Sequence, residues 1–294
     1  MLTKLKNLPQ GRLKINSNSR LFKIYQNLEN ESLKCANYFQ VYEDLLSGYV
    51  GKKITFVEVG VLHGGSLFMW REYFGDQARI IGVDLNPNAK QLEKHGFEIF
   101  IGSQSSNVFW ENFYSKIGKV DILIDDGGHD NDQQIITLNK TIPNIKDGGI
   151  LLVEDTHASY LKKHGNPSKY SFINYSKHLI DVMNSRFPGT NIKTKNKFKN
   201  KIYSIAFYES VVALKIDEEK SLDNISLYNQ TKNLKDMYDM YKTNYFPRIS
   251  KLINEKYSFL NKTPILRKII RKIFFTNNFL VRFKNYLKLK KYFN

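Results

Sequence analysis

Acidic side chains and histidines gather after two apolar runs in the middle of the chain, at 120–124 and 150–153. Four carboxylates and two histidines follow these runs: Asp125, Asp126, His129, Glu154, Asp155 and His157. Four anions packed closely together repel one another, and a bound divalent cation is the simplest way to offset that repulsion. Oxygen ligands with few histidines favour magnesium, calcium or manganese over zinc or copper.

We predict Asp126, Glu154 and Asp155 as the metal ligands, with Mg²⁺ or Mn²⁺ as the ion. Asp125 has two roles open to it, facing a cofactor or capping a glycine turn. The competing structural interpretation is that all four acids cap helices and pair with lysines. His129 directly follows Asp-Asp-Gly-Gly, a position that favours a functional histidine. We expect the other histidines near these motifs to be ordinary loop residues: His63, His157 and His164.

A glycine-rich turn follows an earlier apolar run, 54–59. Glycines such as Gly60 and Gly64 between a strand and a helix allow the backbone to approach a ligand closely. The spacing is not the G-x-G-x-x-G of dinucleotide-binding folds. Glu58, just before the first glycine, is the acid that a methyltransferase uses near the methionine part of S-adenosylmethionine (SAM).

The next run ends at Asp84, which suits hydrogen bonds to the two hydroxyls of a ribose. Its distance from Gly60 is close to the ~20 residues expected of a nucleotide-binding βαβ unit. After the third run, Ser103 and Gln104 could meet an adenine edge or form a plain turn. The residues predicted to contact the cofactor are Glu58, Gly60, Gly64, Ser66, Asp84, Ser103, Gln104 and Asp125.

These motifs need a sheet to position them, and the pattern of apolar runs predicts a parallel one. Almost continuous apolar runs are typical of strands covered on both faces. The predicted strands are 54–59, 79–83, 97–101, 120–124 and 150–153, then an antiparallel pair at 202–207 and 211–214. Helical segments are expected near 67–74, 108–116 and 133–139. This alternation predicts a doubly wound α/β fold, Rossmann-like, with helical extensions at both ends.

The 294 residues divide into three predicted parts: a helical region 1–50, a SAM-binding domain 51–217 and a basic helical extension 218–294. The lysine-rich stretch 191–201 is expected to be a surface loop. The single cysteine, Cys35, excludes an intrachain disulfide and the usual cysteine–histidine zinc sites. Because neither a signal sequence nor a long apolar run is evident, we expect a soluble, cytoplasmic protein.

The net charge of +17 is concentrated in the tail. Residues 261–294 contain ten basic side chains and no acid, so the rest of the chain carries 35 basic and 28 acidic residues, a net of +7. The segment 265–274 has apolar and basic residues on opposite faces of a helical wheel. Such a helix could bind an anionic membrane surface, pack on the body or another subunit as in a homo-oligomer, or contact nucleic acid.

Three segments, 56–71, 124–129 and 153–160, resemble the motifs of a known family. They are similar to the first motif, the Asp-Asp-Gly-Ser-His motif and the Glu-Asp-Thr-His-Thr-Ser-Tyr motif of the macrocin/mycinamicin sugar O-methyltransferases. The cephalosporin-hydroxylase-like proteins share the first of these motifs. The pair 42–43 also matches, and the similarity covers roughly 35–165.

The resemblance implies SAM- and magnesium-dependent methylation of a sugar hydroxyl on a class I methyltransferase fold. It implies that Asp126, Glu154 and Asp155 hold the metal and that His129 is the general base. Two positions depart from the family pattern: Gly128 replaces a serine, and Ser103 stands where aspartate is usual. The acceptor would be a sugar or glycan, for example in surface-polysaccharide or glycoconjugate biosynthesis.

Two other classes of function remain open from the sequence. One is a methyltransferase of nucleic acid or of another small molecule, although the body of the chain is only mildly basic and an Asn-Pro-Pro-Tyr type of motif is absent. The other is a non-catalytic binding protein on the same fold, since fold does not determine function.

Overall fold

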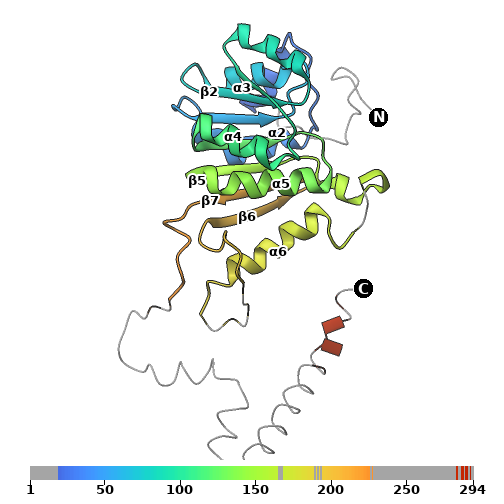
Figure 1. The fold of residues 1–294 in the computed structure, drawn as a ribbon, viewed down its shortest axis with the longest axis vertical. Helices are drawn as coiled ribbons and strands as arrows, with labels where there is room; N and C mark the ends of the chain where they lie inside the picture. The colour runs from blue at the N-terminus through green and yellow to red at the C-terminus, as the bar shows by residue number, and fades with distance from the viewer. Residues whose placement is uncertain are drawn as a thin grey trace, which may run out of the picture. The chain divides into compact units, whose positions relative to one another are not determined.

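The computed structural model (Figure 1) describes residues 19–164, 168–188, 190, 192, 194–225, 227, 283, 286–287, 289–290 and 292. The chain divides into two compact units, Met1–Ile225 and Ser226–Asn294. Within the described residues, no helix has the length and apolar character needed to cross a bilayer. The boundaries expected after residues 50 and 217 stay predictions.

A seven-stranded sheet forms the centre of the first unit, in the order β3-β2-β1-β4-β5-β7-β6. Its strands are β1 (Thr55–Val59), β2 (Arg79–Asp84), β3 (Glu98–Ile101), β4 (Val120–Asp125), β5 (Ile145–Val153), β6 (Ile202–Tyr208) and β7 (Val211–Ile216). The first five are parallel, and β7 pairs antiparallel with both β5 and β6. The predicted doubly wound α/β fold and its closing antiparallel pair are therefore confirmed.

Strand β5 begins five residues earlier than the apolar run 150–153 predicts. The added segment, Ile145–Gly149, is mostly polar or glycine, so its composition hides the strand. Its pairing with β4 is irregular, with a shift in register between Val120 and Ile122.

Helices cover both faces of the sheet (Figure 1). The helices are α1 (Arg20–Asn27), α2 (Tyr38–Leu46), α3 (Gly65–Phe74), α4 (Asn107–Ile117), α5 (Asn131–Thr141) and α6 (Phe172–Asn184). The core beneath α1, α2 and α3 is separate from the core beneath α4, α5 and α6. Adjacent strand residues point to opposite cores: Phe56 packs in the first and Val57 in the second. Burial on both faces is the physical reason why the runs are apolar throughout.

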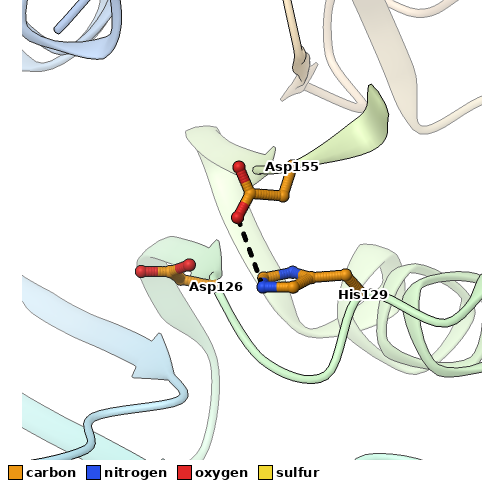
Figure 2. Close-up of side chains that lie close together, drawn as sticks. All are labelled: Asp126, His129 and Asp155. Atoms are coloured by element: carbon orange, nitrogen blue, oxygen red, sulfur yellow. Dashed lines mark ion pairs between the residues drawn. The ribbon is translucent and has the colours of Figure 1, made fainter. Parts of the chain in front are cut away.

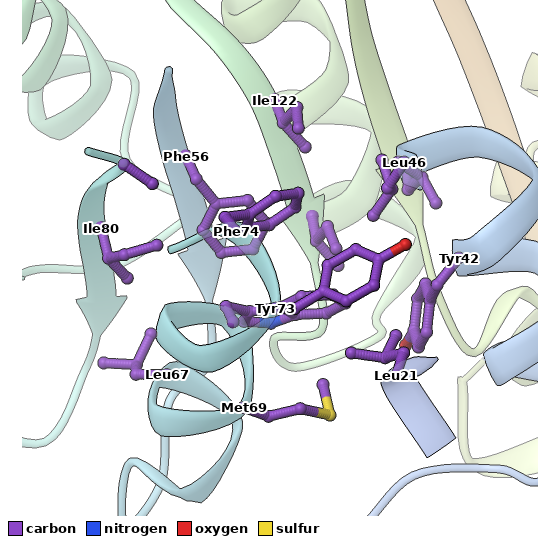
Figure 3. Close-up of a cluster of buried hydrophobic side chains, with 14 of the residues drawn as sticks. Leu21, Tyr42, Leu46, Phe56, Leu67, Met69, Tyr73, Phe74, Ile80 and Ile122 are labelled. Atoms are coloured by element: carbon purple, nitrogen blue, oxygen red, sulfur yellow. The ribbon is translucent and has the colours of Figure 1, made fainter. Parts of the chain in front are cut away.

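Aromatic side chains pack together with aliphatic ones in the first core (Figure 3). Trp70 of α3 stacks with Phe74 and meets Tyr42 of α2 edge to face, with ring centroids 5.0 Å apart in the latter pair. The N-terminal helices are thus packed into the same core as the first strands. This packing brings the segment before α2 to the site described below.

Part of the sequence-based interpretation lies outside the described residues. The two-faced segment 265–274 is there. Further along the basic tail, three described residues are helical: Phe283, Tyr286 and Leu287. In 191–201, the described residues form neither helix nor strand, as expected for a loop, although Phe198 is buried.

Candidate active site

The carboxyl ends of β1, β2, β4 and β5 meet along one edge of the sheet. The direction in which strands are added reverses between β1 and β4, and ligands of open α/β sheets bind at such a switch point. The backbone is very close here, because a Cβ atom placed on Gly60 would lie 2.2 Å from the carbonyl oxygen of Asp126. Gly60 also has a φ of 82°, a conformation that side chains disfavour. Glycine at this position therefore lets the turn after β1 contact the loop after β4.

Asp126, His129 and Asp155 come together at this edge (Figure 2). Each offers a ligand atom, and these atoms lie within 4.8 Å of one another. Nε2 of His129 is 3.2 Å from Oδ2 of Asp155. His129 and Asp155 both have left-handed backbones, with φ of 62° and 52°. Such strain in non-glycine residues is typical of functional sites.

Two tyrosines on one face of α2 bind the two consecutive acids that follow β5. The hydroxyl of Tyr42 donates to Oε1 of Glu154 at 2.5 Å, and that of Tyr38 donates to Oδ1 of Asp155 at 2.5 Å. The backbone N–H of Asp155 donates to the Tyr38 hydroxyl, which also lies 2.9 Å from Oγ of Ser210 in the β6–β7 turn. Helix α2 thus orients both carboxylates.

Lys34, in the connection between α1 and α2, reaches into the centre of the acidic cluster. Its Nζ atom is 2.6 Å from Asp126 Oδ2, 3.1 Å from Glu154 Oε2 and 3.4 Å from Glu58 Oε1. Burial alone would lower the pKa of Lys34, but the negative charges around it outweigh burial and hold that pKa well above its usual range. The side chain is therefore a buried ammonium ion.

Glu58, predicted to contact the cofactor, is fully buried and bound by protein groups. Ser66 donates to its Oε2 at 2.6 Å, while Trp70 Nε1 and Lys34 lie 3.2 and 3.4 Å from its Oε1. Two predicted cofactor residues, Glu58 and Ser66, are thus hydrogen-bonded to each other. Their contact with a cofactor stays a prediction.

Asp125 and Gln104, two more predicted cofactor residues, also face each other. Gln104 Nε2 donates to Asp125 Oδ1 at 3.0 Å, and Gln104 Oε1 accepts from the N–H of Gly128 at 2.8 Å. Burial raises the pKa of Asp125 to about 6, opposed by hydrogen bonds from Gln104 and Gly127. Gln104 therefore links the end of β4 to the loop that carries His129. Of the two roles left open for Asp125, its bond from the Gly127 N–H at 3.2 Å corresponds to capping the glycine turn.

The remaining predicted cofactor residues lie at the ends of β2 and β3 and in the first turn. Asp84 accepts hydrogen bonds from the N–H groups of Val61 and Leu62 through Oδ2, and from that of Asn86 through Oδ1. Gly64 precedes α3 with a φ of 85°. Ser103 is partly exposed and accepts from the N–H of Ser105.

Gly128, the glycine that replaces the serine of the resembling family, has a structural partner in Gln133. A Cβ atom on Gly128 would lie 2.2 Å from Gln133 Oε1, and that oxygen accepts from the N–H of Asp130 in the capping box of α5. Gln133 thus fills the space that a side chain at Gly128 would need.

The donor set fits a hard divalent cation. Carboxylate oxygens, here those of Asp126 and Asp155, are ligands that magnesium and manganese prefer. Nδ1 of His129 is buried and lacks a hydrogen-bond partner among the described residues, so its environment is incomplete. The switch point next to Gly60 and Asp84 suits a nucleotide-like cofactor.

The seven-stranded sheet with these motifs at its carboxyl edge is the class I methyltransferase fold. Residues 57–156 match a protein family described as a methyltransferase domain. The sequence-based resemblance to this class is thereby confirmed. Two of the histidines set aside earlier border the site, since His157 lies 2.6 Å from Ser210 and His164 contacts Asp130.

Among characterised proteins, the chain is similar to the sugar O-methyltransferases. It is 30% identical over 130 residues to 8-demethyl-8-alpha-L-rhamnosyl tetracenomycin-C 2'-O-methyltransferase of Streptomyces olivaceus, covering 42% of this chain and 34% of the relative. It is 24% identical over 183 residues to mycinamicin VI 2''-O-methyltransferase of Micromonospora griseorubida, covering 58% and 45%. The matches therefore span less than half of these relatives.

The fold also matches a solved structure of the MycE methyltransferase in complex with Mg, S-adenosylhomocysteine (SAH) and mycinamycin VI. The TM-score is 0.62 at 19% identity, and the match covers 76% of this chain and 58% of that one. At this identity, the match establishes the shared fold.

Proposed function

We propose that this chain is a SAM- and divalent-metal-dependent O-methyltransferase that acts on a sugar hydroxyl. The observation that carries the proposal is the cluster of Asp126, His129 and Asp155 beside the switch point of a methyltransferase fold. The named activity of the sugar O-methyltransferases to which the chain is similar supports the acceptor class.

Asp126 and Asp155 would hold the metal, with Glu154 beside them. A bound divalent cation would supply positive charge that lowers the pKa of an acceptor hydroxyl. Glu154 is fully buried and both of its oxygens are already bound, one by Tyr42 and the other by Lys34. SAM would supply the methyl group and the reactive chemistry of the transfer.

His129 is the general base of this proposal. Its Nε2 faces Asp155, so a hydroxyl held between the two aspartates would lie within reach of that nitrogen (Figure 2). Taking the proton at Nε2 requires the ring hydrogen of the neutral imidazole to be on Nδ1. The carboxylate of Asp155 would then stabilise the imidazolium that forms. A positioned base of this kind contributes about 10²–10⁴-fold to rate.

The acceptor would be a sugar of a glycoconjugate or surface polysaccharide, methylated in the cytoplasm near the inner face of the membrane. The support for this location is the basic composition of 261–294.

A transfer assay tests the proposal. Purified protein is incubated with SAM that carries a labelled methyl group, Mg²⁺ and a panel of sugars, nucleotide sugars and glycans. Label transferred to a sugar hydroxyl supports the proposal. Label transferred only to RNA, DNA or a phenol would replace it with another methyltransferase activity.

A further inference from the structure

Lys34 is the residue in the acidic cluster that the proposed reaction leaves without a role. Its side chain is only 1% exposed, although its backbone belongs to a connection outside any helix or strand. A buried lysine is costly to desolvate unless it is paired. Here it is paired with three carboxylates at once, those of Glu58, Asp126 and Glu154.

The charges in this cluster do not balance. Glu58, Asp126 and Glu154 can carry three negative charges. Among the described ion pairs, all three acids are paired with the same basic residue, Lys34. Asp155 adds a fourth carboxylate, bound to His129 and Tyr38 instead. With all four carboxylates ionised, the site would contain one cation of its own and an excess of negative charge for a second.

Lys34 and a divalent ion would use the same carboxylates. Nζ takes Oδ2 of Asp126 and Oε2 of Glu154, and Tyr42 takes the other oxygen of Glu154. A metal ion that binds either acid must share its carboxylate with the ammonium group or displace that group. In both cases, a positive charge a few ångströms away lowers the affinity for the ion.

We propose that Lys34 is a positioning residue, a tethered cation that holds Asp126 and Glu154 together in the metal-free site and competes with the divalent ion for them. The inference rests on the proposed function, because it assumes that a divalent ion binds beside Asp126. Its consequence is a site that stays assembled without metal and binds the ion reversibly.

The test is a calorimetric titration of Mn²⁺ into the purified chain and its variants. Lys34→Met retains the length of the side chain and removes its charge. We expect this variant to bind Mn²⁺ about tenfold or more tightly than the unmodified chain, and Lys34→Arg to stay close to it. Lys146→Met is the control. Lys146 also pairs with an acid, Asp121, but Asp121 lies at the start of β4, whereas the site lies at the end of that strand.

Unchanged or weaker binding of Mn²⁺ by Lys34→Met would overturn the role of Lys34. Absence of Mn²⁺ binding by the unmodified chain would instead contradict the metal part of the proposed function, so the two failures are distinguishable. If Lys34→Met does not fold, the double variant Lys34→Met/Glu58→Gln removes a cation and an anion together. Its affinity for Mn²⁺ is then compared with that of Glu58→Gln, and the same increase is expected.

Thermal unfolding separates this role from a purely structural one. A tethered cation can be replaced by a metal ion, so saturating Mn²⁺ should recover most of the Tm that Lys34→Met loses in EDTA. An equal loss of Tm with Mn²⁺ and with EDTA would show that the lysine only supports the fold.

Discussion

Asp155 faces His129 through one carboxylate oxygen, Oδ2, which lies 3.2 Å from Nε2 of the imidazole. The other oxygen of Asp155 is bound by the hydroxyl of Tyr38. The carboxylate is thus held from both sides, by the loop after β4 and by α2. This arrangement holds the imidazole next to Asp126, as the proposed role of His129 as general base requires.

Replacing His129 with alanine should lower kcat by about 10²–10⁴-fold, because the transfer loses its base. Binding of SAM should remain within a few-fold of the unmodified chain, since the proposed role of His129 is on the acceptor side. Steady-state kinetics and calorimetry measure the two quantities. His178→Ala, on the exposed side of α6, is the control. Loss of SAM binding in His129→Ala would contradict the assigned role.

Removing divalent metal should stop the reaction. EDTA would leave Asp126 and Asp155 without the ion that activates the acceptor hydroxyl, and added Mg²⁺ or Mn²⁺ should restore the rate. Asp155→Asn should need a higher metal concentration for half-maximal activity because it removes one ligand charge. The measurement is initial rate against metal concentration. Full activity in excess chelator would exclude a metal-dependent mechanism.

Replacing Tyr42 with phenylalanine should destabilise the metal-free protein by about 1–3 kcal/mol. The change leaves a buried carboxylate oxygen of Glu154 without its donor. Urea unfolding in EDTA measures the loss. Tyr175→Phe provides the comparison, since its hydroxyl binds the neutral amide of Asn139 at a partly buried position. If the two variants lose equal stability, the hydrogen bond from Tyr42 to Glu154 contributes no more to the free energy of unfolding than a hydrogen bond to a neutral amide.

Gly60→Ala should unfold the turn after β1 or displace the loop after β4. The left-handed conformation alone costs roughly 1–2 kcal/mol, and the new Cβ would also meet the Asp126 carbonyl. Gly96 separates the two effects, because it is left-handed with a φ of 81° but has open space around its Cβ position. Chemical unfolding of both alanine variants checks this expectation. A loss no larger at Gly60 than at Gly96 would show that close approach to Asp126 is unimportant.

The sheet could be predicted from the sequence because its strands are buried on both faces. Phe56 and Val57 are both apolar since each enters a different core. Acids at the ends of successive runs then had to share one edge, which brings Asp126 and Asp155 together. The start of β5 was missed because Lys146 and Asp147 interrupt the apolar pattern.

The contribution of the N-terminal segment could not be predicted in the same way. Tyr38 falls at helical spacing with apolar residues, a pattern that indicates a side chain facing the core. The pattern does not predict which group the Tyr38 hydroxyl binds. Lys34 is 92 residues from Asp126 and 120 from Glu154 in the sequence, so their pairing depends on tertiary packing. The match of Tyr42 to the resembling family was the one sequence signal in this region.

The binding of cofactor is the most direct test of the account. SAM and SAH are titrated into the purified protein by calorimetry, once with Mg²⁺ and once with EDTA. We expect micromolar binding of both compounds in both buffers, because the predicted cofactor residues lie at or after the ends of β1, β2, β3 and β4 and the proposal places the metal on the acceptor side. No binding in either buffer would contradict the proposal that this fold transfers methyl groups.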